Sequence, residues 1–276
     1  MSLGSKIQGL RAMLSFDNYW QLVLSRLLFR RTSLVVYRKK GCEFVVDQHA
    51  GDVCGIRALL TTRMYSRFLS HLASLQSKPL KVFDLGSHVG GFPILLHLHG
   101  FTIHRLSCVE LNPSTYARMC FNIANNLKCE FVPFQGAVCA ERKKLSLHLG
   151  KGSTSDSIYA SENSRQASSN SSPCLVEGWT FDELFLRAFS TNAVVDVCKI
   201  DVEGAEYDIF FGSNAHESIR RCAFLVMEIH PRKTYSTSQL IDKLAEYKFV
   251  PVIREPHAGV FLFRNEGLAT SRLSGI

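Results

Sequence analysis

The sequence predicts an α/β fold with a mostly parallel sheet, preceded by an N-terminal extension of helices and a β-hairpin. From residue 80 onward, β-rich segments alternate with helical ones, which is typical of a parallel sheet covered by helices. In that region the stretch FDLGSHVGGF, residues 83–92, passes from an apolar strand through a glycine-bracketed turn into a helix. Turns of this kind lie at the carboxyl edge of open α/β sheets, where ligands bind.

The composition is that of a folded protein with a basic surface. With 276 residues, of which 46% are hydrophobic and 20% charged, the chain can bury a sizeable core. Its 32 Lys and Arg against 24 Asp and Glu give a net charge of +8. Such a surface can bind nucleic acid, anionic lipid or an acidic substrate, but we favour the simpler interpretation of a solvated surface.

The nine cysteines are odd in number, irregularly spaced and without a C-x-x-C pair. This pattern argues against a disulfide framework and against a zinc site. It favours a reducing compartment, and because no signal-peptide pattern is visible, the expected localisation is cytoplasmic.

The N-terminal extension is predicted to cover residues 1–78. Residues 19–31, YWQLVLSRLLFRR, form a helical apolar stripe that Arg26 interrupts, and the segment is too short and too charged to span a bilayer. Such a helix either packs on its own domain, which we favour, or lies on an anionic membrane as a peripheral contact. Residues 34–46 predict a hairpin around Lys-Lys-Gly, and residues 56–76 predict a helix.

The main domain is predicted to cover residues 79–276. Its first half predicts strand 80–85, helix 90–100, strand 103–111, helix 113–127 and strand 129–138. Residues 150–173 are rich in Ser and Asn, so they predict a long polar surface loop. The second half predicts helix 180–189, strand 193–201, strand 223–230, helix 236–248 and an antiparallel pair, 249–253 with 259–263.

The turn after the first strand of this domain holds five candidate binding residues: Asp84, Gly86, Ser87, His88 and Gly90. A strand that ends in D-x-G can bind a nucleoside-bearing cofactor, because glycine removes the Cβ that would block the ligand. The turn matches neither the G-x-G-x-x-G of dinucleotide sites nor the G-K-[ST] of phosphate loops. The next strand ends in Glu110, whose carboxylate can accept both hydroxyls of a ribose.

A second motif, KIDVEGAE at residues 199–206, places four ionisable groups at the end of a buried strand: Lys199, Asp201, Glu203 and Glu206. Burial of so many is costly unless they are paired, bound to a ligand or used chemically. The structural alternative is a helix cap, with the carboxylates at a helix N-terminus and Lys199 paired internally. At the end of the following strand, Glu228 and His230 point to one side and favour a shared site.

Over about residues 80–265 the chain resembles the FkbM-type methyltransferases, through DLGSHVGGF, CVELNP, WTFDEL, VDVCKIDVEGAEYDIFFG and FLVMEIH, in that order. The resemblance implies a Rossmann-like, seven-stranded, mostly parallel sheet, the class I methyltransferase fold, with S-adenosylmethionine as cofactor. In such proteins the first motif usually reads D-[IL]-G-A-N-x-G, so this chain departs from it at Ser87 and His88. It also has the aromatic pair Phe210 and Phe211 where aliphatic residues are usual.

The resemblance also implies where the cofactor binds. Its methionine end would lie at Asp84, Gly86, Ser87, His88 and Gly90, its ribose at Glu110 beside Leu111, and its adenine near Gly136 and Ala137, with Asp201 completing the set. His88 would brace the turn in place of an amide, in preference to contacting the cofactor.

The implied reaction is methylation of a hydroxyl on a sugar, glycan or small-molecule metabolite. His230 is the expected general base, oriented by Asp201 or Glu228, and the further catalytic candidates are Glu203 and Lys199. An equal alternative is that His230 only hydrogen-bonds a loop. A divalent metal on Asp201, Glu203 and His230 is a minority option, and none is expected, because the spacing does not require it.

Two other functions stay open at this point. The charge of +8 suggests an RNA methyltransferase, although no RNA-binding module is evident. The changed first motif suggests a non-catalytic binding protein with the methyltransferase fold. Residues 152–157, GSTSDS, are either a lid over the acceptor or a solvated linker.

Overall fold

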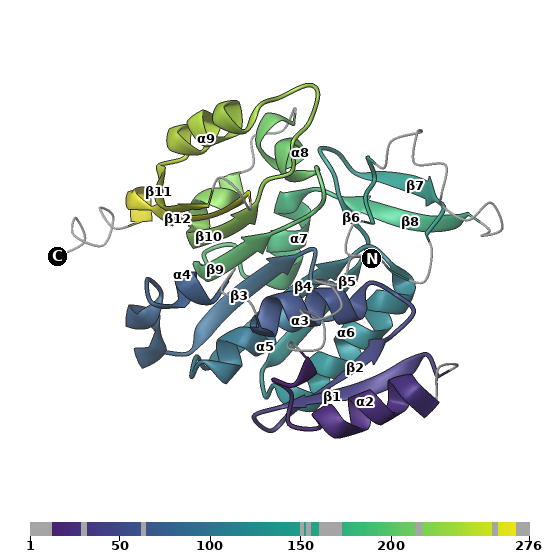
Figure 1. Ribbon diagram of the computed structural model, residues 1–276. Coiled ribbons are helices and arrows are strands. Elements are labelled where there is room, and N and C mark those ends of the chain that lie inside the picture. Colours follow the sequence, from purple (N-terminus) through teal and green to yellow (C-terminus); the bar gives the residue numbers. More distant parts are fainter. Residues whose placement is uncertain are drawn as a thin grey trace.

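The protein is built around one seven-stranded sheet with helices on both faces (Figure 1). The computed structural model describes residues 13–28, 32–61, 65–149, 152, 156–159, 173–212, 217–255 and 259–268. The strand order is β11-β12-β10-β9-β3-β4-β5. The bounds are β3 Leu80–Leu85, β4 Ile103–Glu110, β5 Glu130–Gln135, β9 Val195–Ile200, β10 Cys222–Glu228, β11 Phe249–Glu255 and β12 Val260–Asn265. Five neighbouring strands are parallel, while β12 is antiparallel to β10 and β11. The predicted fold class and the terminal antiparallel pair are confirmed.

Alternation along β3 divides the core into two layers. Leu80 and Val82 face one apolar cluster, which includes side chains of α5 (Gly91–Leu98) and α6 (Pro113–Asn126). Phe83 and Leu85 face the other, which includes α7 (Phe181–Ala188), α8 (Glu206–Phe211) and α9 (Thr237–Glu246). Successive side chains of a strand point to opposite faces, so the strand is buried on both sides.

Local sequence signals explain where several helices begin. At α6 the Asn112 side chain accepts hydrogen bonds from the backbone N–H groups of Ser114 and Thr115, and Pro113 occupies the first turn. Two capping boxes, Thr180 with Glu183 and Ser236 with Gln239, start α7 and α9. Neither α8 nor the 3₁₀ turn η2 (Glu217–Arg221) was predicted.

The N-terminal extension contains the predicted hairpin but not the predicted long helix. β1 (Leu34–Lys39) and β2 (Cys42–Asp47) pair antiparallel, and the turn takes two left-handed residues, Lys40 and Gly41. In place of one helix over 56–76 there are α3 (Asp52–Thr61), α4 (Ser66–Leu69) and the 3₁₀ turn η1 (Ala73–Ser77), after α2 (Tyr19–Leu28) at the start. Tyr65, which precedes α4, packs edge-on against Phe68 and against Phe92 of α5.

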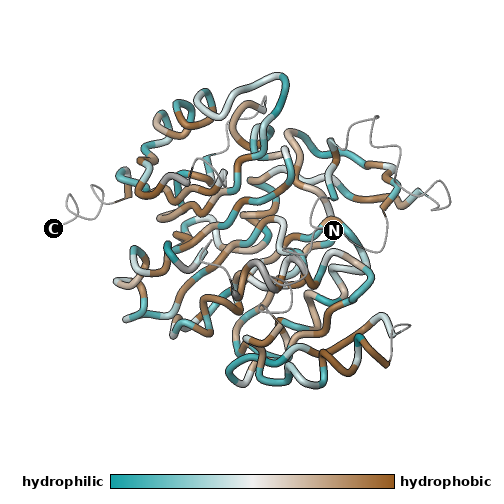
Figure 2. The backbone as a smooth tube through the Cα atoms, viewed as in Figure 1, coloured by the Kyte–Doolittle hydropathy of each residue, from teal (hydrophilic) through white to brown (hydrophobic). Residues whose placement is uncertain are grey.

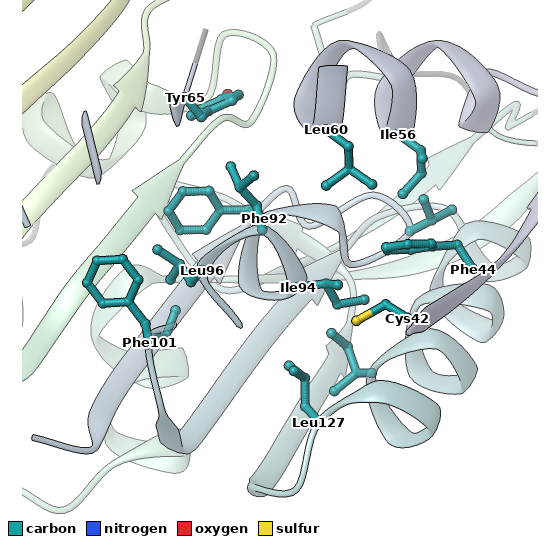
Figure 3. Packing of buried hydrophobic residues seen from close by; sticks show 14 of the residues in the cluster. Cys42, Phe44, Ile56, Leu60, Tyr65, Phe92, Ile94, Leu96, Phe101 and Leu127 are labelled. Carbon is teal, nitrogen blue, oxygen red and sulfur yellow. The ribbon is translucent and has the colours of Figure 1, made fainter. Parts of the chain in front are cut away.

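Two asparagines of α6 join the hairpin to the main sheet's helices. The Asn126 side chain exchanges hydrogen bonds with the N–H and C=O of Glu43, and Asn122 does the same with Val45, four residues along the helix. They satisfy the edge of β2 as a neighbouring strand would. Figure 3 shows Phe44 and Ile56 of the extension beside Ile94 of α5, in one apolar cluster. The boundary predicted between residues 78 and 79 stays a prediction.

The strand predicted over 129–138 is divided in two. β5 ends at Gln135, and β6 (Ala137–Val138) leaves the main sheet to pair with β8 (Cys174–Trp179), which also pairs with β7 (Lys143–Leu147). Gly136 is the point of division, since a Cβ there would lie 2.5 Å from the Glu177 carbonyl oxygen. This small sheet was not predicted. The predicted loop over 150–173 falls mostly outside the described residues, which include 152, 156–159 and 173 of it.

No helix in the described ranges is long and apolar enough to cross a membrane. The hydropathy view in Figure 2 has its brown, apolar segments mostly inside the sheet and helices, with α2 as a visible exception at the surface.

Gly86, in the turn between β3 and α5, is required by the protein's own backbone. It has φ +74°, and a Cβ there would lie 1.7 Å from the carbonyl oxygen of Asp201. The space that the missing side chain leaves is therefore filled by the loop after β9, which corrects the expectation that this glycine makes room for the ligand.

We expect Gly86→Ala to lower the free energy of unfolding by about 2–5 kcal/mol, from left-handed strain together with overpacking. Gly41→Ala is the matched control, because Gly41 also has a left-handed φ, +83°, but nothing within 4 Å of an added Cβ. It should cost only about 1–2 kcal/mol. Urea denaturation measures both, and equal losses would show that the contact with Asp201 is unimportant.

Candidate active site

A cavity of about 310 Å³ lies at the carboxyl ends of the parallel strands, in the size range of small-molecule sites. Most of the predicted site residues line it: Gly86, Ser87, His88, Glu110, Leu111, Gly136, Ala137, Lys199, Asp201, Glu203 and Glu228. Three predicted residues are not among its lining: Asp84, Gly90 and His230. Asp84 is fully buried at the end of β3, and His230 contacts the lining residue Glu203.

The buried side chain of Lys199 links two loops that line the cavity. The side chain is 4% exposed, and Nζ lies 2.9 Å from Asp201 Oδ2 and 3.0 Å from the carbonyl oxygen of Gly86. Asp84 Oδ1 is 3.6 Å away. Burial alone would lower the pKa of Lys199, but the two carboxylates raise it above its usual value, so the ammonium stays charged. The alternative in which Lys199 is paired internally is thus what the structure shows.

Glu110 presents a buried carboxylate to the cavity. Its Oε2 accepts a hydrogen bond of 2.9 Å from the N–H of His88, and its Oε1 accepts one of 2.9 Å from the N–H of Asn112. Burial raises the pKa of Glu110 to about 7, although these two N–H groups act in the opposite direction. Each oxygen keeps a further lone pair, so the carboxylate can still accept two hydroxyls of a diol.

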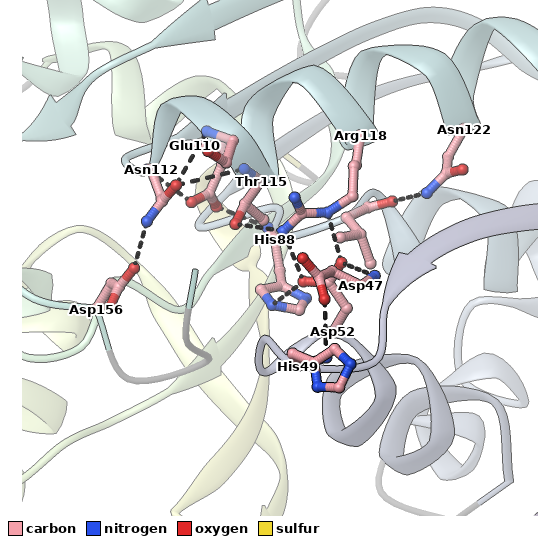
Figure 4. A network of polar contacts seen from close by, with 12 residues as sticks. Asp47, His49, Asp52, His88, Glu110, Asn112, Thr115, Arg118, Asn122 and Asp156 are labelled. Carbon is pink, nitrogen blue, oxygen red and sulfur yellow. Dashed lines mark hydrogen bonds and ion pairs between the residues drawn. The ribbon is translucent and has the colours of Figure 1, made fainter. Parts of the chain in front are cut away.

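His88 connects the turn to the N-terminal extension (Figure 4). Its backbone is left-handed, φ +49°, a conformation that Asn and His adopt more often than other side chains, so the change from the usual Asn preserves the turn. The ring Nε2 lies 3.6 Å from Oδ1 of Asp52, a fully buried carboxylate that is 2.5 Å from Arg118 Nε. Burial is the main cause that lowers the pKa of His88, so the ring is neutral. The ring faces Asp52 at the start of α3, at a distance beyond hydrogen-bond range, so the bracing role of His88 stays a prediction.

Glu206, which was not among the predicted catalytic residues, orients His230. Its Oε1 lies 3.0 Å from His230 Nδ1, and its two oxygens also accept the N–H groups of Val202 and Gly204. The other ring nitrogen, Nε2, is 3.4 Å from Glu203 Oε2 and 3.8 Å from Glu228 Oε1. The orienting carboxylate is therefore Glu206, in place of the predicted Asp201 or Glu228. Glu206 also lies in the first turn of α8, but no side chain caps this helix, so the predicted helix cap is wrong.

The close carboxylates and the histidine shift each other's pKa values. Burial would lower the pKa of His230, but the hydrogen bond and charge of Glu206, with Glu203 and Asp201, raise it to about 9. Burial raises the pKa of Glu203 to about 7, helped by Asp201 and Glu228 and opposed by His230. Burial, followed by the charge of Asp201, also raises the pKa of Glu228. In this site Glu203 titrates near neutrality while His230 is protonated.

Tyr65 enters the site from the extension and was missed at the sequence level. Its side chain is 4% exposed, and its hydroxyl lies 3.2 Å from Glu228 Oε2 and 3.5 Å from Asp201 Oδ2. Burial and the two carboxylates raise its pKa well above the usual value, so the hydroxyl keeps its proton and donates a hydrogen bond to them. No local motif marks it, since its partners lie 136 and 163 residues further along the chain.

Part of the predicted lid lies at the cavity. Asp156 and Ser157 line it, and Asp156 accepts a hydrogen bond of 2.9 Å from the Asn112 side chain. Ser157 donates one of 2.5 Å to the carbonyl oxygen of Glu203. The segment thus joins the loops after β4 and β9, and residues 153–155 of the predicted lid lie outside the described residues.

Asp201, Glu203 and His230 each offer a ligand atom within 4.8 Å of the others, so this group could hold a divalent metal. Oxygen and imidazole ligands of this kind suit several divalent ions.

Two methyltransferases are among the solved structures to which this chain is similar. Among solved structures, a candidate SAM-dependent methyltransferase from Streptococcus mutans has 10% identity and a TM-score of 0.45, and the alignment covers 84% of this chain and 56% of that one. Methyltransferase FkbM from Methylobacillus flagellatus KT has 13% identity and a TM-score of 0.43, over 67% of this chain and 43% of that one. The chain thus spans about half the length of these two proteins. Identities and TM-scores as low as these support no conclusion about this chain.

No curated protein sequence matches the chain. The family model of the methyltransferase FkbM domain, in contrast, matches residues 84–251, from the end of β3 into β11. The match confirms the resemblance seen in the motifs and includes both KIDVEGAE and EIH. Because this match covers more than half of the chain, the chain belongs to the FkbM methyltransferase family, whose cofactor is S-adenosylmethionine.

Proposed function

We propose that the protein transfers the methyl group of S-adenosylmethionine to a hydroxyl oxygen of a sugar or small-molecule metabolite. One observation carries the proposal: Glu203, whose pKa burial raises to about 7, lines the same cavity as the carboxylate of Glu110. The first can accept a proton from an alcohol and the second can hold a ribose.

The residues present fit S-adenosylmethionine. Glu110 would hold the ribose hydroxyls, the backbone at Gly86 and Ser87 would border the methionine end, and Gly136 with Ala137 would border the adenine. The cofactor supplies a methyl group activated by a sulfonium. Asp201 and Glu228 line the cavity as well, and their negative charge favours a cationic ligand there.

Glu203 is the group that we assign to accept the hydroxyl proton. It lines the cavity, whereas His230 does not, and at neutral pH the raised pKa of His230, about 9, leaves its ring with no free lone pair. The pKa of Glu203, about 7, lies where a general base is most effective. Its left-handed backbone, φ +52°, shows that the loop holds it in an uncommon conformation, as is frequent at functional sites.

His230 then acts as a positioning residue. Glu206 is fully buried and fixes Nδ1, which directs Nε2 toward Glu203. The positive ring stabilises the ionised form of Glu203 and so keeps its pKa from rising further.

The acidic lining speaks against a nucleic-acid acceptor at this cavity. Asp156, Asp201, Glu203 and Glu228 all border it, and carboxylates there would repel phosphate groups. An uncharged hydroxyl compound meets no such repulsion. The turn keeps its left-handed residue at His88 and its hydrogen bond from the N–H of His88 to Glu110, although its sequence departs from the usual motif. These features support a cofactor site that can bind its ligand.

Labelled methyl transfer from S-adenosylmethionine to a panel of sugars, glycosides and polyols, with total RNA alongside, tests this function. We expect base-stable label in a hydroxyl compound and none in RNA. Glu203→Gln should lower kcat by a factor on the order of 10²–10⁴ with S-adenosylhomocysteine affinity unchanged, because only proton transfer is lost. Glu217→Gln, at a side chain that is 66% exposed, is the control. Label in RNA, or full activity of Glu203→Gln, would contradict the proposal.

The pH dependence of stability tests the charge state of His230. The pKa of His230 rises from 6.5 to about 9 on folding. Its contribution to the free energy of unfolding is therefore fully present below pH 6.5 and is lost as the pH rises through about 9. We expect the free energy of unfolding to fall over this window in the unmodified protein and to fall less in His230→Gln. His104→Gln, at an exposed position on β4, is the control. Identical curves for the protein and His230→Gln would show that the ring is not protonated.

A further inference from the structure

The helix α2 has an apolar face on each side. Leu22 is buried against the rest of the protein, as expected of a packed surface helix. The outward side carries Trp20, Leu24, Leu27 and Leu28, which are 54%, 43%, 61% and 68% exposed. Their spacing of i, i+4, i+7 and i+8 aligns them on one face of the helix. A helix that only covers its own domain would be polar there.

The strand next to α2 also carries exposed apolar side chains. α2 packs on β1, where Leu34 and Val36 alternate outward and are 53% and 38% exposed. We call Trp20, Leu24, Leu27, Leu28, Leu34 and Val36 the α2–β1 face. Of the twelve exposed large apolar side chains in the described part of the chain, eight fall between residues 14 and 36. Such clustering marks an interaction surface, whereas single exposed leucines are ordinary. Figure 2 shows α2 as a brown coil at the bottom edge of the molecule.

Basic residues lie beside this face. The described residues 13–28 and 32–46 contain four Lys and Arg against two Asp and Glu, a net charge of +2. Arg26 is exposed on α2 itself. Arg38 on β1 is exposed and shares its charge with Glu43 at 2.7 Å. The surface is therefore both apolar and cationic.

We propose that the α2–β1 face docks the protein on a membrane surface that contains anionic phospholipids. Leucines and a tryptophan beside basic residues suit the boundary between acyl chains and anionic headgroups. Each nearby Lys or Arg adds attraction to the negative surface potential. Since no described helix is long and apolar enough to span a bilayer, α2 lies in the plane of the interface. A second copy fits less well, because a twofold contact would bring two positively charged surfaces together.

The test is co-sedimentation of the full chain with phosphatidylcholine vesicles, with and without about a third of phosphatidylglycerol. We expect binding to the anionic vesicles that weakens with salt, and none to the neutral ones. Lipids with brominated acyl chains should quench the fluorescence of the protein but not of Trp20→Phe, because Trp179 lies on β8, which is well apart from α2 in Figure 1.

The double variant Leu27→Gln/Leu28→Gln removes the two most exposed leucines of α2 and should weaken vesicle binding at least about tenfold. Leu175→Gln/Leu186→Gln is the matched control, since these side chains are 67% and 47% exposed on β8 and α7. Methyl-acceptor chemistry plays no part in this readout. No binding to anionic vesicles, or equal binding by the two double variants, would overturn the proposal. So would a dimer in ultracentrifugation that only the α2 variant dissociates, which would assign the face to a second copy.

Discussion

The buried ammonium group of Lys199 is the interaction on which the rest of the site depends. It holds Asp201 in the loop after β9 and the carbonyl oxygen of Gly86 in the turn after β3, so it links two loops that line the cavity. A neutral side chain there would leave Asp84 and Asp201 without their cation, and breaking a buried pair costs about 3–5 kcal/mol. The same turn presents the N–H of His88 to the carboxylate of Glu110.

The N-terminal extension completes the site from the opposite side. Tyr65 binds the carboxylates of Glu228 and Asp201, and Asp52 stands behind the ring of His88. Gly55, Ile56 and Leu59 of α3 line the cavity as well. One segment thus combines a wall of the proposed active site with a surface suited to lipid, on different faces. The proposed chemistry needs the first, whereas the proposed membrane contact uses only the second.

Much of the sheet and its acidic edge could be predicted, because period-2 burial and the alternation of strands and helices are local signals. Glu110 and the KIDVEGAE cluster could be placed together because parallel strands end at one edge. Tyr65 could not, since its partners are more than a hundred residues away in the sequence. Nor could the sequence tell which carboxylate orients His230. Glu203 and Glu206 belong to the same short motif, and only the conformation of the loop places Glu203 at Nε2 and Glu206 at Nδ1. The break at Gly136 depends on the approach of Glu177, a contact that no strand pattern contains.

The central claim is that this cavity binds S-adenosylmethionine through Glu110. Calorimetric titration with S-adenosylmethionine and S-adenosylhomocysteine tests it most directly, on the protein, on Glu110→Ala and on Glu130→Ala, a control at an exposed carboxylate of β5. The account predicts saturable binding by the protein and by the control, and a loss of at least about tenfold in Glu110→Ala, because two charge-assisted hydrogen bonds would be removed. Absence of binding by the folded protein, or unchanged affinity in Glu110→Ala, would contradict it.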